Sequence, residues 1–116
     1  MKKKKRLYLV VPAFNEEIDI PLWLESIHKS KWKNIFKKIV IVDDGSTDRT
    51  LENIVTYKYK LPLQIISYRE NRGPGYAFRQ GLRAALKIAE KGSMIVTMEC
   101  DNTSDLGILP KMIREI

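Results

Sequence analysis

Short apolar runs alternate with longer amphipathic segments along the whole chain. The apolar runs, at residues 7–11, 39–42, 61–68 and 94–98, are rich in β-branched and aromatic residues and predict four strands. Between them, apolar residues recur at helical spacing and predict helices over residues 18–31, 51–59 and 76–89, with a further helix over 106–116. This alternation predicts an α/β fold with a Rossmann-like, doubly wound, mostly parallel sheet and helices on both of its faces.

A polar cluster follows each predicted strand. The clusters lie at residues 12–17, 43–48, 69–75 and 99–105, and Pro12 is expected to end the first strand. Because the carboxyl ends of parallel strands share one edge of a sheet, we expect the four clusters to meet there. That edge is where open α/β sheets bind nucleotides and other ligands.

Two adjacent carboxylates, Asp43 and Asp44, come directly after the uninterrupted apolar run 39–42. Such a run is typical of a strand buried on both faces, so the two acids need a cation, a hydrogen-bond donor or a ligand N–H group nearby. Ser46 and Asp48 are candidate N-caps for the next helix. The alternative is that one aspartate caps this helix while the other is solvated.

Glu99 and Asp101 stand two residues apart after the last predicted strand. Extended backbone places alternate side chains on the same side, so both carboxylates could hold Mg²⁺ or Mn²⁺ together with diphosphate oxygens. Such a cation would stabilise a leaving diphosphate. An isolated acid-x-acid pattern more often marks a turn. Cys100, between the two acids, is expected to be a small buried residue, because no histidine nearby could activate its thiol.

The length of 116 residues predicts a single domain, residues 7–116, after a basic tail at residues 1–6. No apolar run approaches the roughly 20 residues of a membrane helix, and the run after the tail is too short for a signal peptide. A lone cysteine excludes an internal disulfide. We therefore expect a cytoplasmic protein, with peripheral association at the cytoplasmic membrane face as an option.

The formal net charge of +7 is concentrated in the tail and in lysines between residues 29 and 38. These cations could favour anionic lipid headgroups or phosphates, or they could form an ordinary solvated face. They are not interleaved with aromatic residues as in a nucleic-acid binder. No nucleic-acid partner is expected.

Four motifs, in order along the chain, resemble those of family 2 glycosyltransferases of the GT-A fold. They are VVPAFNEE at 10–17, VDDGSTDRT at 42–50, RENRGPGYAFRQGL at 69–82, and the acid-x-acid at 99–101. The likeness is greatest to the polyprenol-phosphate (dolichol-phosphate) mannosyl- and glucosyltransferases, and it covers almost every residue from Leu7 onward. It implies the N-terminal, nucleotide-sugar-binding part of that fold.

The resemblance also implies a set of site residues. By it, residues of the first motif line the nucleotide pocket, the paired aspartates contact the base and ribose, and the third motif shapes a loop near the nucleotide. Glu99 and Asp101 take the places of the family's D-x-D, which holds the metal and the sugar diphosphate, although Glu99 is one methylene longer than aspartate. The residues so implied are Pro12, Phe14, Asn15, Glu16, Asp43, Asp44, Arg69, Asn71, Gly75, Glu99 and Asp101.

The resemblance implies sugar transfer from a UDP- or GDP-sugar to an acceptor such as a polyprenyl phosphate. Family members continue through further strands that carry the acceptor site and the catalytic base, so we expect the donor-binding half, truncated relative to the family, with a completing chain or a homo-oligomer as options. No catalytic base is assigned, and activity of this chain alone is left open. The alternatives are a pseudoenzyme acting as a nucleotide-binding or membrane-surface adaptor, and a receiver-like domain, which would carry its acidic pair after the first strand.

Overall fold

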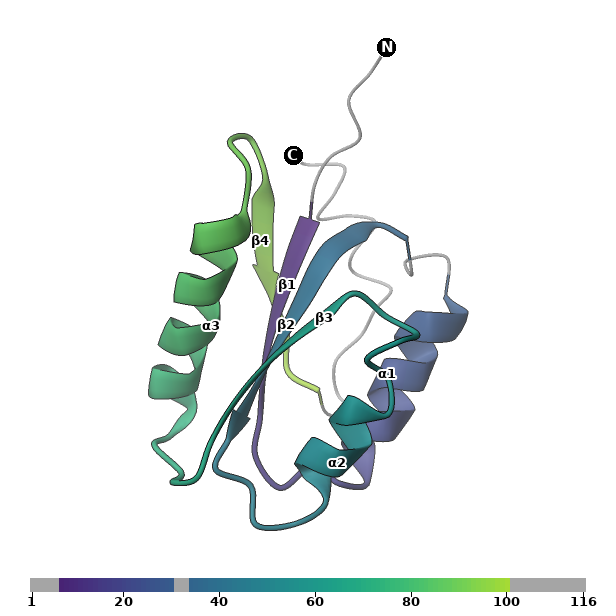
Figure 1. Cartoon of the computed structure of the whole chain (residues 1–116), viewed down its shortest axis with the longest axis vertical. Helices are drawn as coiled ribbons and strands as arrows, with labels where there is room; N and C mark the ends of the chain where they lie inside the picture. Colours follow the sequence, from purple (N-terminus) through teal and green to yellow (C-terminus); the bar gives the residue numbers. More distant parts are fainter. Residues whose placement is uncertain (1–6, 31–33, 101–116) are drawn as a thin grey trace.

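A computed structural model describes residues 7–30 and 34–100 of the chain (Figure 1). The predicted helix over 106–116 lies outside these residues. Strands and helices alternate, as expected, in the order β1 (Leu7–Ala13), α1 (Asp19–Lys29), β2 (Phe36–Asp44), α2 (Thr50–Val55), β3 (Leu63–Tyr68), α3 (Pro74–Ile88) and β4 (Met94–Thr97).

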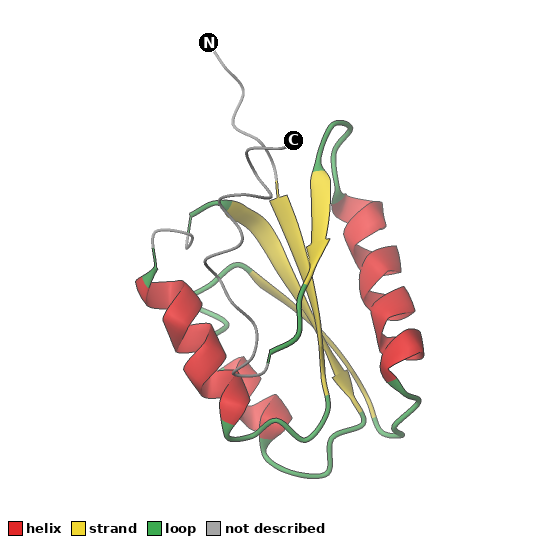
Figure 2. Cartoon of the chain, turned by 180° about the vertical axis from the view of Figure 1, so that it is seen from behind, coloured by secondary structure: helices red, strands yellow, loops and turns green. Residues whose placement is uncertain are grey.

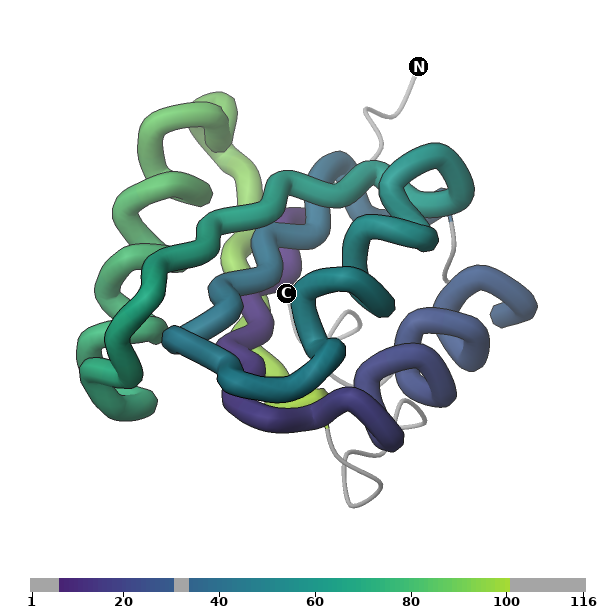
Figure 3. Tube along the Cα trace, turned by 60° about the horizontal axis from the view of Figure 1, so that its bottom comes forward, coloured from purple at the N-terminus to yellow at the C-terminus, as the bar shows by residue number. Residues whose placement is uncertain are grey.

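The four described strands form one parallel sheet in the order β3-β2-β1-β4. Val10 of β1 is in register with Val40 of β2 on one side and with Thr97 of β4 on the other. Helices α1 and α2 cover one face of the sheet and α3 covers the other (Figures 2 and 3). The predicted doubly wound α/β fold is confirmed.

Alternate side chains of the central strands build a core on each face, because successive residues of a strand point to opposite sides. Leu7, Leu9 and Val11 pack in the core that includes Ile20 and Leu24 of α1. Tyr8 and Val10 point the other way and join the core that includes Ala77 and Ala85 of α3. This double burial explains why the strands are apolar without interruption.

Small residues let α3 lie close to the sheet. Ala77, Gly81 and Ala85 form its buried face. A Cβ added at Gly81 would lie 2.4 Å from Val10 Cγ1 and 3.1 Å from Val42 Cγ2. The fit of α3 against β1 and β2 therefore depends on this glycine, and it fixes where the first turn of α3 stands at the carboxyl edge of the sheet.

The prediction that Pro12 ends the first strand is wrong, because β1 continues to Ala13. Pairing with β4 stops at Val10, whereas pairing with β2 continues through Ala13. The carbonyl oxygen of Pro12 lies 3.7 Å from Cys100 Sγ. The backbone of Pro12 therefore faces the edge of β1 on which β4 pairs, at a point where that pairing has already ended. A proline costs no ladder hydrogen bond at such a place.

Two other boundaries differ from the prediction by three residues or more. Strand β2 begins at Phe36 rather than residue 39, because Phe36 is buried and in register with Leu7 although Lys37 and Lys38 interrupt the apolar pattern. Helix α2 ends at Val55 rather than near residue 59, and tight turns that run to Leu61 follow it. None of the helices in residues 7–30 and 34–100 is long and apolar enough to cross a membrane.

Candidate functional site

A cavity of about 360 Å³ opens at the carboxyl edge of the sheet, within the size range of small-molecule sites. We call it the carboxyl-edge pocket. All four polar clusters contribute to it, as expected, together with the first turns of α3. Its lining residues are Pro12, Ala13, Phe14, Glu16, Asp44, Asn71, Pro74, Phe78, Glu99 and Cys100.

The residues implied from sequence divide into three groups. Six of them line the pocket: Pro12, Phe14, Glu16, Asp44, Asn71 and Glu99. Four are described but are not among its lining residues: Asn15, Asp43, Arg69 and Gly75. Asp101 lies outside the described residues.

The carboxylate of Asp44 organises the loop between β3 and α3. Asp44 is only 2% exposed, and its Oδ1 accepts hydrogen bonds from Tyr68 Oη at 2.6 Å and Arg72 N at 2.9 Å. Its Oδ2 accepts from Asn71 Nδ2 at 2.9 Å and Gly73 N at 3.0 Å. Burial and the bond to Asp44 raise the pKa of Tyr68 above its usual range. Hydrogen bonds from protein donors thus satisfy this carboxylate and hold the loop at the pocket.

Asp43 is 3% exposed and holds the turn that follows β2. Its Oδ1 accepts from Ser46 N at 3.2 Å and its Oδ2 from Ser67 Oγ at 2.9 Å. The turn itself requires Gly45, where φ is +68° and an added Cβ would lie 2.3 Å from Asn71 N. The alternative in which one aspartate caps the next helix while the other is solvated is therefore wrong.

Asn15 ties the β1–α1 loop to the turn after β2. Its φ is 50°, and its Oδ1 accepts from Thr47 N at 2.8 Å while its own N–H donates to Ser46 Oγ at 3.0 Å. Ser46 is therefore engaged with this loop and does not cap α2. Asn15 orders the chain on either side of the pocket-lining Phe14 and Glu16.

Asp48 joins the start of α2 to the β1–α1 loop. Its Oδ1 accepts from Thr50 N at 2.9 Å and its Oδ2 from Glu17 N at 3.4 Å. Burial alone would raise the pKa of Asp48, but the hydrogen bonds from Thr50 and Glu17 outweigh it and hold this pKa below its ordinary value. Of the two predicted caps, Asp48 is the one that binds a backbone N–H group of α2.

Aromatic side chains give the pocket an apolar wall. Phe14 is 43% exposed, which leaves its ring open to a ligand. Phe78 lies one helical turn after Pro74, which brings both to the pocket. Phe78 was missed from sequence because it reads as part of the apolar face of α3. Cys100 is buried, as expected, at 3% exposure.

Glu99 brings an exposed carboxylate to the same pocket. Within residues 7–30 and 34–100, no three His, Cys, Asp or Glu side chains gather into a metal site. Mg²⁺ in nucleotide sites takes one or two carboxylates and completes its shell with water and phosphate oxygens. A pocket lined by Glu16 and Glu99, and large enough for a phosphate group, fits that kind of ion.

Comparison with known proteins agrees with this architecture. A dodecaprenyl-phosphate galacturonate synthase of Rhizobium johnstonii is 33% identical over 118 residues, covering 95% of this chain and 32% of that protein. This similarity confirms the likeness to the polyprenol-phosphate branch. The chain thus spans about a third of the length of this relative.

Solved structures superpose on the same fold. S. aureus TarS 1–349 in complex with UDP has a TM-score of 0.73 at 30% identity, covering 95% of this chain and 32% of that one. A mannosyltransferase of Pyrobaculum calidifontis in complex with GDP-Man and Mn²⁺ has a TM-score of 0.67 at 26% identity, covering 85% and 28%. Residues 8–116 match the family described as glycosyl transferase family 2. This chain therefore belongs to glycosyl transferase family 2 and has the fold of GT-A enzymes.

Proposed function

We propose that the carboxyl-edge pocket binds a nucleotide-sugar donor, and that the chain is the donor-binding part of a sugar transferase. The observation that carries this proposal is the convergence of four sequence motifs, far apart along the chain, on one cavity at the carboxyl edge. The UDP and GDP-Man complexes of the structural relatives support it. The dodecaprenyl-phosphate relative supports a polyprenyl phosphate as the sugar acceptor.

In this proposal different lining residues of the pocket contact different parts of the donor. Phe14 and Phe78 offer aromatic surface against which the base can pack. Asp44 acts through the 69–73 loop, because its four hydrogen bonds hold the backbone and Asn71 at the pocket wall. Glu99 lies with Cys100 on the β4 side, where the diphosphate and its cation would lie.

We propose Glu99 and Asp101 as the residues that hold the divalent cation, Mg²⁺ or Mn²⁺. The Mn²⁺ of the Pyrobaculum relative supports this assignment. When bound, such an ion neutralises the diphosphate and stabilises it as a leaving group. The acceptor site and the catalytic base belong to further chain, supplied by a longer protein, a completing chain or a second copy.

Calorimetric titration of the purified chain with UDP and with GDP, each with and without Mn²⁺, tests the proposal. We expect one nucleotide to bind, and to bind more tightly with Mn²⁺. Glu99→Gln keeps the shape of the side chain and removes its charge, so the Mn²⁺-dependent gain in affinity should disappear. Glu52→Gln is the matched control, because Glu52 is exposed on α2 and pairs with Arg49 outside the pocket.

Absence of heat with either nucleotide, from a chain shown by circular dichroism to be folded, would contradict donor binding. The adaptor alternative would then remain. Binding that is equally tight without Mn²⁺, and unchanged in Glu99→Gln, would retain the nucleotide but reject the metal assignment.

A further inference from the structure

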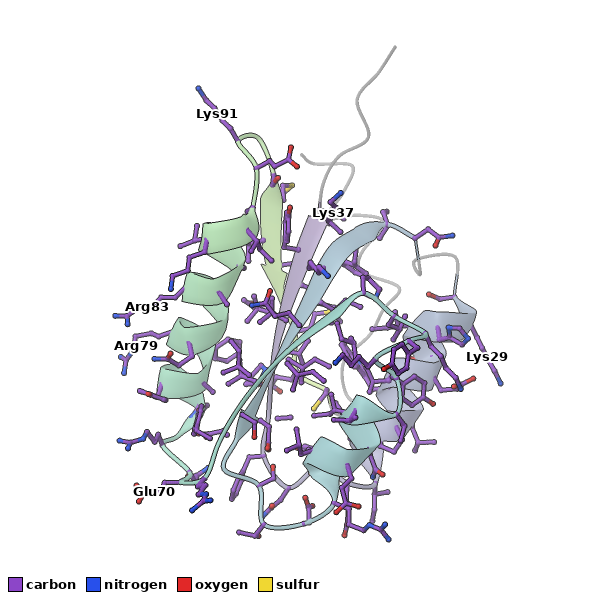
Figure 4. The ribbon with its side chains drawn as sticks, viewed as in Figure 1. Lys29, Lys37, Glu70, Arg79, Arg83 and Lys91 are labelled. Atoms are coloured by element: carbon purple, nitrogen blue, oxygen red, sulfur yellow. The ribbon has the colours of Figure 1, made fainter. Side chains whose placement is uncertain are left out.

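The outer face of α3 carries a row of cations. Arg79, Arg83 and Lys87 follow one another at four-residue spacing, and residues 74–88 contain no aspartate or glutamate. At about 100° per residue these three side chains fall within an arc of roughly 80° on the helix. Figure 4 shows Arg79 and Arg83 pointing away from the sheet, and Lys91 beyond the end of the helix.

These cations have no acidic partner among the described residues. The surface ion pairs within residues 7–30 and 34–100 engage Lys29, Arg49 and Arg72, and none engages Arg79, Arg83 or Lys87. Like charges at four-residue spacing destabilise an isolated helix by about 0.2–0.5 kcal/mol per pair. An anionic partner would relieve that repulsion.

The same helix face borders a second cavity, of about 320 Å³, between β3 and α3. We call it the β3–α3 cavity. Arg83 and Lys87 line it together with the amide side chains of Gln64 and Gln80, which come from β3 and α3. Two cations and two amide donors suit a phosphate group. No residue is shared with the lining of the carboxyl-edge pocket.

Exposed apolar side chains accompany the cations. Leu86 is 67% exposed and lies seven residues after Arg79, almost two full helical turns, so it shares the outer face of α3. Ile88 is 39% exposed and lines the β3–α3 cavity. Cations beside exposed leucine and isoleucine are typical of helices that lie in a membrane interface, and they favour a lipid surface over a purely ionic partner.

We propose that the outer face of α3, together with the β3–α3 cavity, docks onto a bilayer that contains anionic phospholipids. Arg79, Arg83 and Lys87 contact the headgroup phosphates and Leu86 enters the interface. The first turns of α3 carry Pro74 and Phe78 of the carboxyl-edge pocket, so docking would hold that pocket beside the bilayer. This goes beyond donor binding, since membrane docking requires no nucleotide.

Sedimentation of the full chain with vesicles tests the docking. We expect the chain to bind vesicles of mixed phosphatidylcholine and phosphatidylglycerol, and not vesicles of phosphatidylcholine alone. The triple variant Arg79→Gln, Arg83→Gln and Lys87→Gln should partition on the order of a hundredfold more weakly, because each cation near an anionic surface strengthens binding about fivefold. Leu86→Gln should weaken the binding that survives at high salt.

A second triple variant, Lys29→Gln, Arg49→Gln and Lys58→Gln, is the matched control. It removes the same net charge from exposed positions on α1, α2 and the turn after α2, on the opposite face of the sheet. The ion pairs that this variant loses are exposed and contribute little to the free energy of unfolding. We expect it to keep vesicle binding within a few fold, whereas an equal loss in both triple variants would overturn the proposal.

Two further outcomes would also overturn it. Vesicle binding that the α3 variant retains in full would place membrane contact elsewhere, for example in the basic tail. Tighter binding to duplex DNA or to inorganic phosphate than to the mixed vesicles would identify a different anionic ligand. UDP titration of both triple variants distinguishes failure of donor binding from failure of membrane docking. Both variants should bind UDP as the unsubstituted chain does, because neither set of residues lines the carboxyl-edge pocket.

Discussion

Replacing Asp44 with alanine should open the loop between β3 and α3 and destabilise the whole domain. The substitution removes the acceptor of four hydrogen bonds, donated by Tyr68, Asn71, Arg72 and Gly73 at 2.6–3.0 Å. Asp44 is 2% exposed, so water does not replace these bonds unless the loop moves.

The size of the effect follows from these contacts. A hydrogen bond to a charged group contributes about 1.5–3 kcal/mol, but bonds that share one carboxylate are not additive. The freed donors lie in a loop and can regain water by moving. We therefore expect Asp44→Ala to lower the free energy of unfolding by about 3–5 kcal/mol, a large part of the about 5–15 kcal/mol that holds a typical domain folded.

Urea denaturation followed by circular dichroism measures this loss. Tyr68→Phe removes one of the four donors and should lower the free energy of unfolding by about 1–2 kcal/mol, so it provides a second measurement if Asp44→Ala does not fold. Glu52→Gln, at an exposed position, should change stability by less than about 0.5 kcal/mol. A loss below about 1 kcal/mol in Asp44→Ala, with an unchanged dependence on urea, would refute the structural role and leave this carboxylate available to a ligand.

Three further predictions concern stability. Gly81→Ala should lower the free energy of unfolding, measured by thermal denaturation, by about 1–3 kcal/mol, because the added Cβ would clash with Val10 of β1. Gly75→Ala, whose added Cβ has no atom within 4 Å, should lower it by less than about 0.5 kcal/mol. The folded-state pKa of Asp48 is lowered, so its contribution to the free energy of unfolding is present above pH of about 4 and is lost as the pH falls through the lower folded pKa. Asp48→Asn should therefore make the free energy of unfolding depend less on pH in the acid range. The hydrogen bond to Glu25 and, second, burial raise the pKa of Tyr57 to about 12. Tyr57→Phe should therefore remove the phenol that ionises near that pH in an absorbance titration. The same variant should lose less of its free energy of unfolding between pH of about 10 and 12.

The sheet could be predicted from sequence because its strands carry one strong signal. β1 and β2 are buried on both faces, so residues 7–11 and 39–42 read as uninterrupted apolar runs, and helices α1 and α3 each show an apolar face. The boundaries could not be predicted as well. Lys37 and Lys38 interrupt the apolar pattern at the start of β2, so the sequence does not indicate that the strand begins at Phe36. Pro12 is tolerated within β1 because β4 pairs with β1 no further than Val10.

The candidate site was predictable only in part, because sequence places residues at an edge but does not say what their side chains contact. The position of Asp44 could be predicted, but not its four donors, which come from the end of β3 and the loop after it, 24 to 29 residues further along. Asn15 belonged to the right motif but contacts Ser46 and Thr47 rather than the cavity. Phe78 carried no polar signal to separate it from the apolar face of α3.

The most direct test of donor binding is to map where UDP or GDP contacts the folded chain, by amide chemical shifts during an NMR titration in the presence of Mg²⁺. We expect the largest changes at Ala13, Asn71 and Phe78, around the carboxyl-edge pocket, and none at Gln64 or Lys87 of the β3–α3 cavity. Changes centred on the β3–α3 cavity, or no saturable change anywhere in the sheet, would contradict the claim that this edge is the donor site.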